Sequence, residues 1–162
     1  MRRKDTLTII SGGQTGVDRA ALDAALANGV PCGGWCPAGR KAEDGRVPEQ
    51  YPLQELESAD YRQRTIRNVQ DSDATVIIHF GPLSGGTRLT LNTCNHEGVP
   101  YLLIDGAVVH IDEAVGQVSA FIDRLDIRVL NVAGPRASNN PDAWNYAFQV
   151  INSLLQNVGN HG

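Results

Sequence analysis

The sequence predicts one α/β domain of the doubly wound type, in which helices flank a mainly parallel sheet of about five strands. Short apolar runs alternate along the chain with stretches of helical periodicity, as expected for strands joined by helices. These runs are continuously apolar, a pattern typical of parallel strands that helices cover on both faces. A chain of 162 residues suffices for one such domain and is too short for two ordinary ones, so residues 1–162 are taken as a single domain.

The first half of the chain begins with an expected strand at 7–10, an apolar run that stops before a glycine pair. Residues 17–28 place a valine and several alanines on one face of a helix, and Gly29 stands where a helix-ending glycine belongs. A short strand is expected within 30–36. Residues 37–52 are rich in charge, glycine and proline, so we expect a loop there.

The second half repeats the alternation of strand and helix. A helix is expected at about 60–70, and the run "ATVIIHF" at 74–80 is the clearest strand of the chain. The remaining expected elements are a helix at 87–96, a strand at 101–104, a helix capped by Asp112 and running to Arg124, a strand at 127–132, and a terminal helix that Asn140 caps and Pro141 opens.

Composition and charge argue against several classes of protein. The net charge is −4, so no overall basic field recruits nucleic acid. No run approaches the ~18 apolar residues of a membrane span, and the N-terminal apolar run is shorter than that of a secretory signal. We therefore expect a cytoplasmic protein without nucleic-acid or membrane partners. Cys32, Cys36 and Cys94 lack C-x-x-C spacing and are expected to be small, semi-buried residues.

Three glycine-bearing loops each follow an expected strand and open a helix: "SGGQTG" at 11–16, "GPLSGGT" at 81–87 and "AGPRAS" at 133–138. In a doubly wound sheet, ligands bind beyond the carboxyl ends of the strands. Glycine lets an anion approach the backbone N–H groups, and a helix N-terminus adds about half a positive charge. Each loop alone could be a tight turn, and "GGQTG" matches neither the dinucleotide nor the P-loop fingerprint. Together the loops predict an anion site, most simply for phosphate.

Charged side chains near these loops each have two interpretations. Thr15 and Asp18 stand in the T-x-x-D relation of a capping box, and Asp18 and Arg19 could instead face the ligand pocket. Arg40 and Lys41 belong either to a solvated surface loop or to a lid whose cations grip oxyanions. Both pairs are kept as candidate ligand-binding residues.

Arg136, on the third loop, is the best single candidate for binding an anion by its side chain. Catalytic candidates are few, because the serines of the loops have no base nearby in sequence and the G-x-S-x-G motif is absent. No histidine pair or carboxylate cluster has the spacing of a catalytic metal site. No catalytic residue and no metal ligand is assigned.

Long segments of the chain resemble one known family. The segments "GGQTGVDRAALDAAL", "GWCPAGRKAEDG", "YRQRTIRNVQDSDATVI", "SGGTRLT" and "LNVAGPRASNNP" resemble the molybdenum cofactor carrier-like family, which is part of the SLOG superfamily of Rossmann-like domains that bind nucleotide-derived ligands. The resemblance runs from about Ile9 to Pro141, most of the chain. It implies a Rossmann-like fold.

The resemblance also implies a function and a set of binding residues. The expected protein is a cytoplasmic homo-oligomer, a dimer or tetramer, that holds molybdenum cofactor, a phosphorylated pterin whose dithiolene carries the metal. No structural metal is implied. Together with the charged candidates above, the expected ligand-binding residues are Gly12, Gly13, Gln14, Thr15, Gly16, Asp18, Arg19, Arg40, Lys41, Ser84, Gly85, Gly86, Thr87, Arg136 and Ser138.

Two alternatives remain open at this stage. The superfamily also contains nucleoside-monophosphate phosphoribohydrolases, whose P-G-G-x-G-T-x-x-E loop supplies a glutamate for glycosidic cleavage. The corresponding stretch here, "LSGGTRLTLN", has Thr90 in the place of that glutamate, so such an enzyme would need Asp18, Glu43 or Asp44 as its carboxylate. The other alternative is a regulatory domain that senses a nucleotide.

Overall fold

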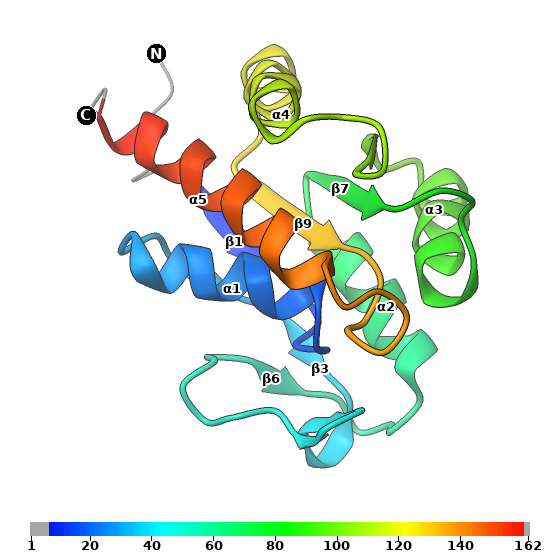
Figure 1. Ribbon diagram of the computed structural model, residues 1–162. Helices are drawn as coiled ribbons and strands as arrows, with labels where there is room; N and C mark the ends of the chain where they lie inside the picture. Colours follow the sequence, from blue (N-terminus) through cyan, green and yellow to red (C-terminus); the bar gives the residue numbers. More distant parts are fainter. Residues whose placement is uncertain (1–6, 161–162) are drawn as a thin grey trace.

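A five-stranded sheet, parallel throughout, forms the centre of the computed structural model, which describes residues 7–160 (Figure 1). The strands lie in the order β2-β1-β9-β7-β8. Their bounds are Thr8–Ile10 for β1, Cys32–Gly33 for β2, Ala74–His79 for β7, Tyr101–Asp105 for β8 and Val129–Ala133 for β9. The predicted Rossmann-like α/β fold with a parallel sheet of about five strands is therefore confirmed.

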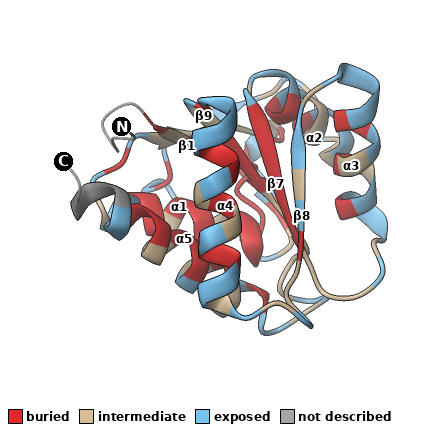
Figure 2. Ribbon diagram, turned by 90° about the horizontal axis from the view of Figure 1, so that it is seen from above, coloured by how far each residue is buried: buried red, intermediate tan, exposed pale blue. Residues whose placement is uncertain are grey.

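Helices cover both faces of this sheet. Helices α1, α4 and α5 pack together on one face, and α2 and α3 pack against each other on the other (Figure 2). Their bounds are Val17–Ala27 for α1, Tyr61–Gln70 for α2, Gly85–Glu97 for α3, Ile111–Leu125 for α4 and Ala143–Asn160 for α5. Among the described residues, no helix is both long and apolar enough to cross a membrane.

The central strands are buried as their apolar sequences predict. Residues 74–78 of β7 are all buried, since helices cover this strand on both faces. Strand β8 differs from the prediction, because Tyr101 and Leu103 are 37% and 38% exposed. It lies at the edge of the sheet, where α4 packs on one face while α3 packs over the neighbouring β7. A run of apolar residues therefore predicts that a strand is present, but it does not predict whether helices cover one or both of its faces.

The strand expected within 30–36 is divided between two sheets. Strand β2 pairs with β1, whereas β3 (Trp35–Cys36) pairs with β6 (Gln54–Glu55) in a separate two-stranded sheet. The break falls at Gly34, whose φ is +125° and whose position for a Cβ lies 2.3 Å from the carbonyl oxygen of Ser11. Only glycine fits this close approach of the two backbones.

Residues 37–53, which we call the strap, form an ordered excursion beside α1. The strap holds a short 3₁₀ turn, Ala38–Arg40, and a two-stranded hairpin of β4 (Lys41–Ala42) and β5 (Gly45–Arg46). Its apolar side chains Val47, Tyr51 and Leu53 pack with Leu22 of α1 in a second, smaller core. The expected loop thus has a packed interior of its own.

Three helices begin at residues other than those expected. Helix α3 starts at Gly85 after the N-cap Ser84, two residues before the expected start. The N-cap of α4 is His110, so Asp112 lies in the first turn and does not cap. Asn140 accepts a hydrogen bond from the Asp142 N–H (2.9 Å), but this turn precedes α5, which begins at Ala143.

Strand β9 occupies the position that assembles the three glycine-bearing loops. It pairs in parallel with both β1 and β7, so the loops after these three strands leave neighbouring points on the same edge of the sheet. Helices α1 and α5 follow β1 and β9 on one face, and α3 follows β7 on the other. The crevice between β9 and β7 is therefore the point at which ligands bind in such sheets.

Neighbouring atoms pack closely around Gly134 at the end of β9, and this predicts the effect of adding a side chain there. A Cβ at Gly134 would lie 2.4 Å from the Ile78 carbonyl oxygen and 2.6 Å from Val17 Cγ2. We expect Gly134→Ala to lower the free energy of unfolding by about 1–3 kcal/mol, because the packed backbone must move. The control is Gly116→Ala in α4, where a Cβ would meet nothing within 4 Å. That change should stabilise the protein by up to ~1 kcal/mol. Urea unfolding measures both, and equal stability of Gly134→Ala and the unchanged protein would contradict the packing described.

Candidate functional site

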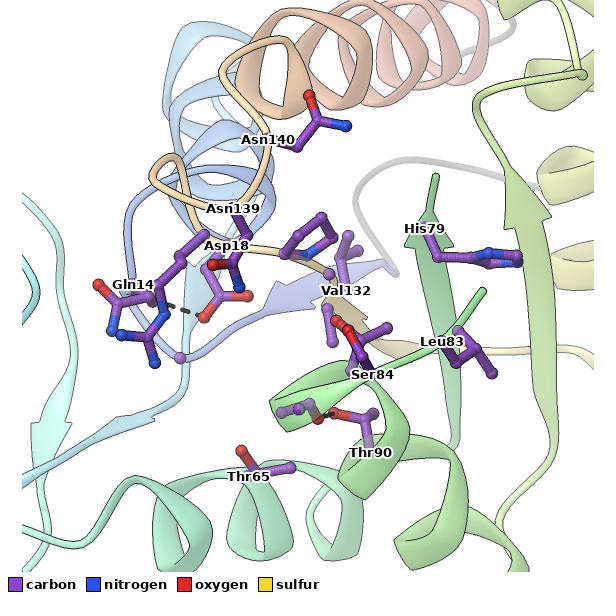
Figure 3. A pocket seen from close by; sticks show the side chains of 18 of the residues that line it. Gln14, Asp18, Thr65, His79, Leu83, Ser84, Thr90, Val132, Asn139 and Asn140 are labelled. Carbon is purple, nitrogen blue, oxygen red and sulfur yellow. Dashed lines mark hydrogen bonds between the residues drawn. The ribbon is translucent and has the colours of Figure 1, made fainter. Parts of the chain in front are cut away.

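The three loops border one cavity of about 330 Å³, a volume typical of small-molecule sites (Figure 3). Helix α2 also contributes residues to the lining, so elements on both faces of the sheet border the cavity. Figure 3 shows Gln14 and Asp18 on one side of the pocket, and Ser84 and Thr90 on the other. Of the expected ligand-binding residues, those that line the pocket are Gly12, Gln14, Asp18, Ser84, Gly85, Gly86, Thr87, Arg136 and Ser138.

The start of α3 is open toward the pocket. A Cβ at Gly85 or Gly86 would meet no atom within 4 Å, and the Ser84 side chain does not cap the helix. Among the described residues, no hydrogen bond engages the N–H groups of Gly85, Gly86 and Thr87. These groups carry the positive end of the dipole of a 13-residue helix. The second loop is therefore built to receive an anion on its backbone.

The glycines of the first loop have other uses. A Cβ at Gly12 would lie 2.4 Å from Arg64 Cδ, and a Cβ at Gly13 would lie 2.5 Å from Leu53 Cδ1. Gly16 has φ +83°, and a Cβ at Gly16 would lie 2.4 Å from the Pro135 carbonyl oxygen. Gly13 and Gly16 are absent from the pocket lining. The missing side chains make room for neighbouring protein groups, and an anion contact at Gly12, Gly13 or Gly16 stays a prediction.

Gln14 is a buried pocket residue, 5% exposed, whose amide is held at one end only. Its Oε1 accepts from the N–H groups of Thr15 (3.1 Å) and Glu43 (2.9 Å). These two donors identify the oxygen end, so Nε2 is the other atom. Among the described residues, Nε2 is the one buried side-chain nitrogen or oxygen without a hydrogen-bond partner.

Thr15 and Asp18 do not form the expected capping box. Helix α1 is capped by Gly16, and the Thr15 hydroxyl instead donates to a Glu43 carboxylate oxygen and accepts from the Ala137 N–H. Thr15 therefore joins the first loop to the strap and to the third loop. Asp18 is the member of this pair that lines the pocket.

Asp18 lies buried on the first turn of α1, beside Arg64 of α2. Its Oδ2 accepts from the Gln14 N–H (3.3 Å) and from Arg64 Nη1 (3.4 Å), both long contacts. Arg64 Nη1 also donates to the Gly12 carbonyl oxygen (3.0 Å). Burial raises the pKa of Asp18, and the charge of Arg64 opposes this rise. Arg19 turns away from the pocket and forms two hydrogen bonds, of 2.5 and 2.8 Å, with Asp44.

Glu43 joins the strap to the third loop. Its carboxylate accepts from the backbone N–H of Ser138 (3.1 Å), from the Ser138 hydroxyl and from Thr15, and lies 4.0 Å from Arg136 Nη1. Burial alone would raise the pKa of Glu43, but these donors outweigh it and hold the pKa below its ordinary value. The ionised Glu43 carboxylate therefore holds the strap to the third loop, and we call this set of hydrogen bonds the latch. The carboxylate also takes up the backbone N–H and the hydroxyl of Ser138 as hydrogen-bond donors.

Three cations surround the ring of Tyr61 at the start of α2. Lys41 Nζ lies 4.7 Å from the ring centroid, and the guanidinium carbons of Arg64 and Arg136 lie 5.5 and 5.2 Å from it. Each contact is attractive because the face of an aromatic ring is negative. Lys41 is exposed and lies outside the pocket lining, whereas Arg64 and Arg136 border it. The cluster gives this rim a local positive charge in an acidic protein.

Arg40 does not take the expected role of a lid residue that binds an oxyanion. Its side chain is buried in the strap and donates to four backbone carbonyls, those of Val47, Pro48, Tyr51 and Leu53. Arg40 does not line the pocket. Its guanidinium is needed inside the strap, where the irregular backbone offers carbonyl groups that would otherwise be buried without donors.

The cysteines lie away from this site. Cys36 and Cys94 are buried, Cys32 is half-buried, and burial raises the pKa of each thiol. The prediction of semi-buried cysteines therefore holds for Cys32, whereas Cys36 and Cys94 are fully buried. Within residues 7–160, no three His, Cys, Asp or Glu side chains gather closely enough to hold a metal ion.

Several lining residues escaped the sequence prediction. Helix α2 contributes Arg64, Thr65 and Asn68, and the helical spacing of three and four residues could have grouped them on one face. The other residues without an earlier assignment include Thr90, His79, Leu83, Asn131, Asn139 and Asn140.

The latch predicts a stability effect that depends on pH. Because the folded pKa of Glu43 lies below its ordinary value of 4.5, the ionised carboxylate stabilises the fold above that pH. This contribution is lost as the pH falls through the folded pKa. We expect Glu43→Gln to cost about 1 kcal/mol of unfolding free energy at pH 7, and the difference from the unchanged protein should shrink in acid.

The matched control is Glu49→Gln, since Glu49 pairs with Arg46 on the exposed surface of the same strap. It should change the urea midpoint little at any pH. A Glu43→Gln variant that unfolds like the Glu49→Gln variant at pH 7 would show that the latch contributes nothing.

The comparisons with known proteins agree with this architecture. Among proteins with curated descriptions, none matches the chain. The model of the circularly permutated YpsA SLOG family matches residues 9–155. A solved structure of similar fold is that of a "putative molybdenum carrier protein" from Syntrophus aciditrophicus SB, with 44% sequence identity and a TM-score of 0.92. That alignment covers 96% of this chain and 98% of the other. These matches support a carrier or binding role and confirm the inferred resemblance: the chain belongs to the circularly permutated YpsA SLOG family.

Proposed function

We propose that this protein binds and carries molybdenum cofactor, or a closely related phosphorylated heterocycle, in the pocket between β9 and β7. The phosphate would lie at the N-terminus of α3, on the N–H groups of Gly85, Gly86 and Thr87. Arg136 would add a formal positive charge from the third loop. The similar solved structure is named a putative molybdenum carrier protein, which supports a cargo that contains molybdenum.

One observation carries this proposal: the pocket combines an open helix start with a buried amide donor that has no partner. The glycines of the second loop leave the N–H groups of α3 accessible, and Gln14 Nε2 lacks an acceptor within the described protein. Both features call for acceptor atoms on a ligand. The cargo would bring its own metal–sulfur bonds, and no cysteine lines the pocket.

A carrier role is favoured over hydrolysis by the residue at position 90. Thr90 lines the pocket, and its hydroxyl donates to the Gly86 carbonyl oxygen (3.0 Å), so it supports the helix. A hydroxyl engaged in this way cannot replace the carboxylate of the related phosphoribohydrolases. Of the three carboxylates considered for an enzyme, Asp18 alone lines the pocket.

Retention of cargo is the direct test. Native mass spectrometry of freshly purified protein should show a bound phosphorylated ligand. The same measurement reports the number of subunits, for which a dimer or tetramer stays a prediction. Incubation with AMP and other nucleoside monophosphates should release no free base. Catalytic appearance of base would contradict the carrier role and favour the phosphoribohydrolase.

Removing the charge of Arg136 should weaken binding of GMP or molybdenum cofactor by about 10- to 100-fold, the effect of one charge-assisted hydrogen bond. Arg136→Lys should restore only part of the affinity, since an ammonium cannot reproduce a bidentate guanidinium. The control is Arg62→Ala, because Arg62 is exposed and pairs with Asp60 at the surface. It should change affinity by about twofold or less. Equal losses for Arg136→Ala and Arg62→Ala in calorimetric titrations would mean that attraction is diffuse.

A further inference from the structure

The unpartnered amide of Gln14 specifies the kind of atom that it would contact. Its oxygen end is fixed by the N–H groups of Thr15 and Glu43, so the amide cannot turn over without losing both hydrogen bonds. Nε2 therefore presents N–H donors and no acceptor. A buried donor left unpaired destabilises the protein, and an acceptor on a ligand would remove that cost.

The Asp18 side chain, next to Gln14, offers hydrogen-bond acceptors instead of donors. The Gln14 backbone N–H donates to Asp18 Oδ2, so the two residues lie together at the start of α1. Asp18 Oδ2 accepts hydrogen bonds from Gln14 and Arg64 at 3.3 and 3.4 Å, the Ser11 side chain is a further partner of the carboxylate, and the residue borders the cavity. A carboxylate accepts hydrogen bonds from donors on both of its oxygens. Side by side, Gln14 and Asp18 thus offer one donor group and one two-oxygen acceptor.

This end of the pocket is unsuited to phosphate. The carboxylate of Asp18 already lies in the first turn of α1 and balances the positive end of that helix dipole. The Val17 N–H at the same helix start is bound to the Pro135 carbonyl oxygen (3.2 Å). Although Arg64 and Arg136 lie nearby, a phosphate placed against Asp18 would meet a like charge, whereas the start of α3 has no acidic residue in its first turn. The two helix starts therefore favour different parts of one ligand.

We infer that Asp18 and Gln14 select the 2-amino-4-oxo-pyrimidine edge that guanine and pterins share. That edge presents, in order, a carbonyl oxygen, a ring N–H and an amino group. Gln14 Nε2 would donate to the carbonyl oxygen, and the Asp18 carboxylate would accept from the ring N–H and the amino group. This inference rests on the proposed function, which places the phosphate of the same ligand at α3.

The same arrangement rejects an adenine edge. In the orientation described for guanine, adenine would place its amino donor against the Gln14 donor and the lone pair of its unprotonated ring nitrogen against the Asp18 carboxylate. Sites that read hydrogen bonds discriminate strongly, because the wrong ligand leaves buried polar groups unpaired. A preference for the 2-amino-4-oxo edge over adenine is therefore the property to measure.

Calorimetric titrations with GMP, IMP, AMP, a pterin carrying a methyl phosphate, and inorganic phosphate provide the test. GMP should bind at least about tenfold more tightly than IMP, which lacks the amino group, and IMP more tightly than AMP. The pterin phosphate presents the same edge as GMP on a different ring system. The tighter of these two identifies whether the site is shaped for a pterin or a nucleotide.

Two variants separate recognition of the edge from recognition of phosphate. Asp18→Asn should weaken GMP by about 10- to 100-fold and leave inorganic phosphate unchanged. Gln14→Glu keeps the acceptor for Thr15 and Glu43 but removes the donor, so it should also weaken GMP selectively. The control is Asp44→Asn, which makes the same change outside the pocket lining, beside Arg19. Circular dichroism and urea unfolding establish that each variant is folded.

Selective loss of GMP and pterin phosphate in both pocket variants, with Asp44→Asn unaffected, supports the inference. Equal affinities of the unchanged protein for GMP and AMP, or equal weakening of GMP and phosphate by Asp18→Asn, would overturn it while leaving a phosphate-binding carrier intact. Absence of binding by phosphate, all three nucleotides and the pterin phosphate would overturn the proposed function and this inference together.

Discussion

The parallel pairing of β9 with both β1 and β7 is the constraint on which the site depends. Strands β1 and β7 both precede β9 in the sequence, yet β9 lies between them in the sheet. Each of the three strands ends in a glycine-bearing loop, and their adjacency brings loops separated by more than a hundred residues to one crevice. Displacing β9 would separate the loops even if each kept its local conformation. The tight fit of Gly134 between Ile78 and Val17 shows how closely this arrangement is packed.

Sequence patterns predicted the elements and the convergence of the loops, because both follow from local periodicity and from the geometry of parallel sheets. They could not distinguish the uses of the individual glycines. Gly85 and Gly86 leave open space at the start of α3, whereas Gly12 and Gly13 make room for Arg64 and Leu53. That distinction depends on side chains that arrive from distant segments. The unequal burial of β8 likewise depends on its place in the sheet order, which its own sequence does not encode.

The strap shows why charged residues in a glycine-rich loop are difficult to assign. A cluster of cations suggests an anion-gripping lid, and Arg136 and Lys41 do lie near the same aromatic ring. Arg40, however, satisfies four backbone carbonyls inside the strap, which has too little regular structure to pair them by itself. Glu43 was considered as a catalytic carboxylate, but its oxygens are engaged by Ser138 and Thr15. In an irregular segment, the need to pair backbone groups decides the role of a side chain before any ligand does.

Charge in the pocket is divided, and the division orients a ligand. The protein is acidic overall, so attraction for an anion must come from a few local groups. The open N–H groups of α3 supply it on one side, and Arg136 supplies it from the third loop, while Asp18 places a buried carboxylate beside Gln14. Arg64 lies between Gly12 and Asp18 and keeps that carboxylate in place without a short hydrogen bond. A ligand with an anionic end and a donor-rich end fits both sides in one orientation only, because reversal would set phosphate against Asp18 and leave the N–H groups of α3 without an anion. Orientation of this kind lets a carrier present the same part of its cargo each time it binds.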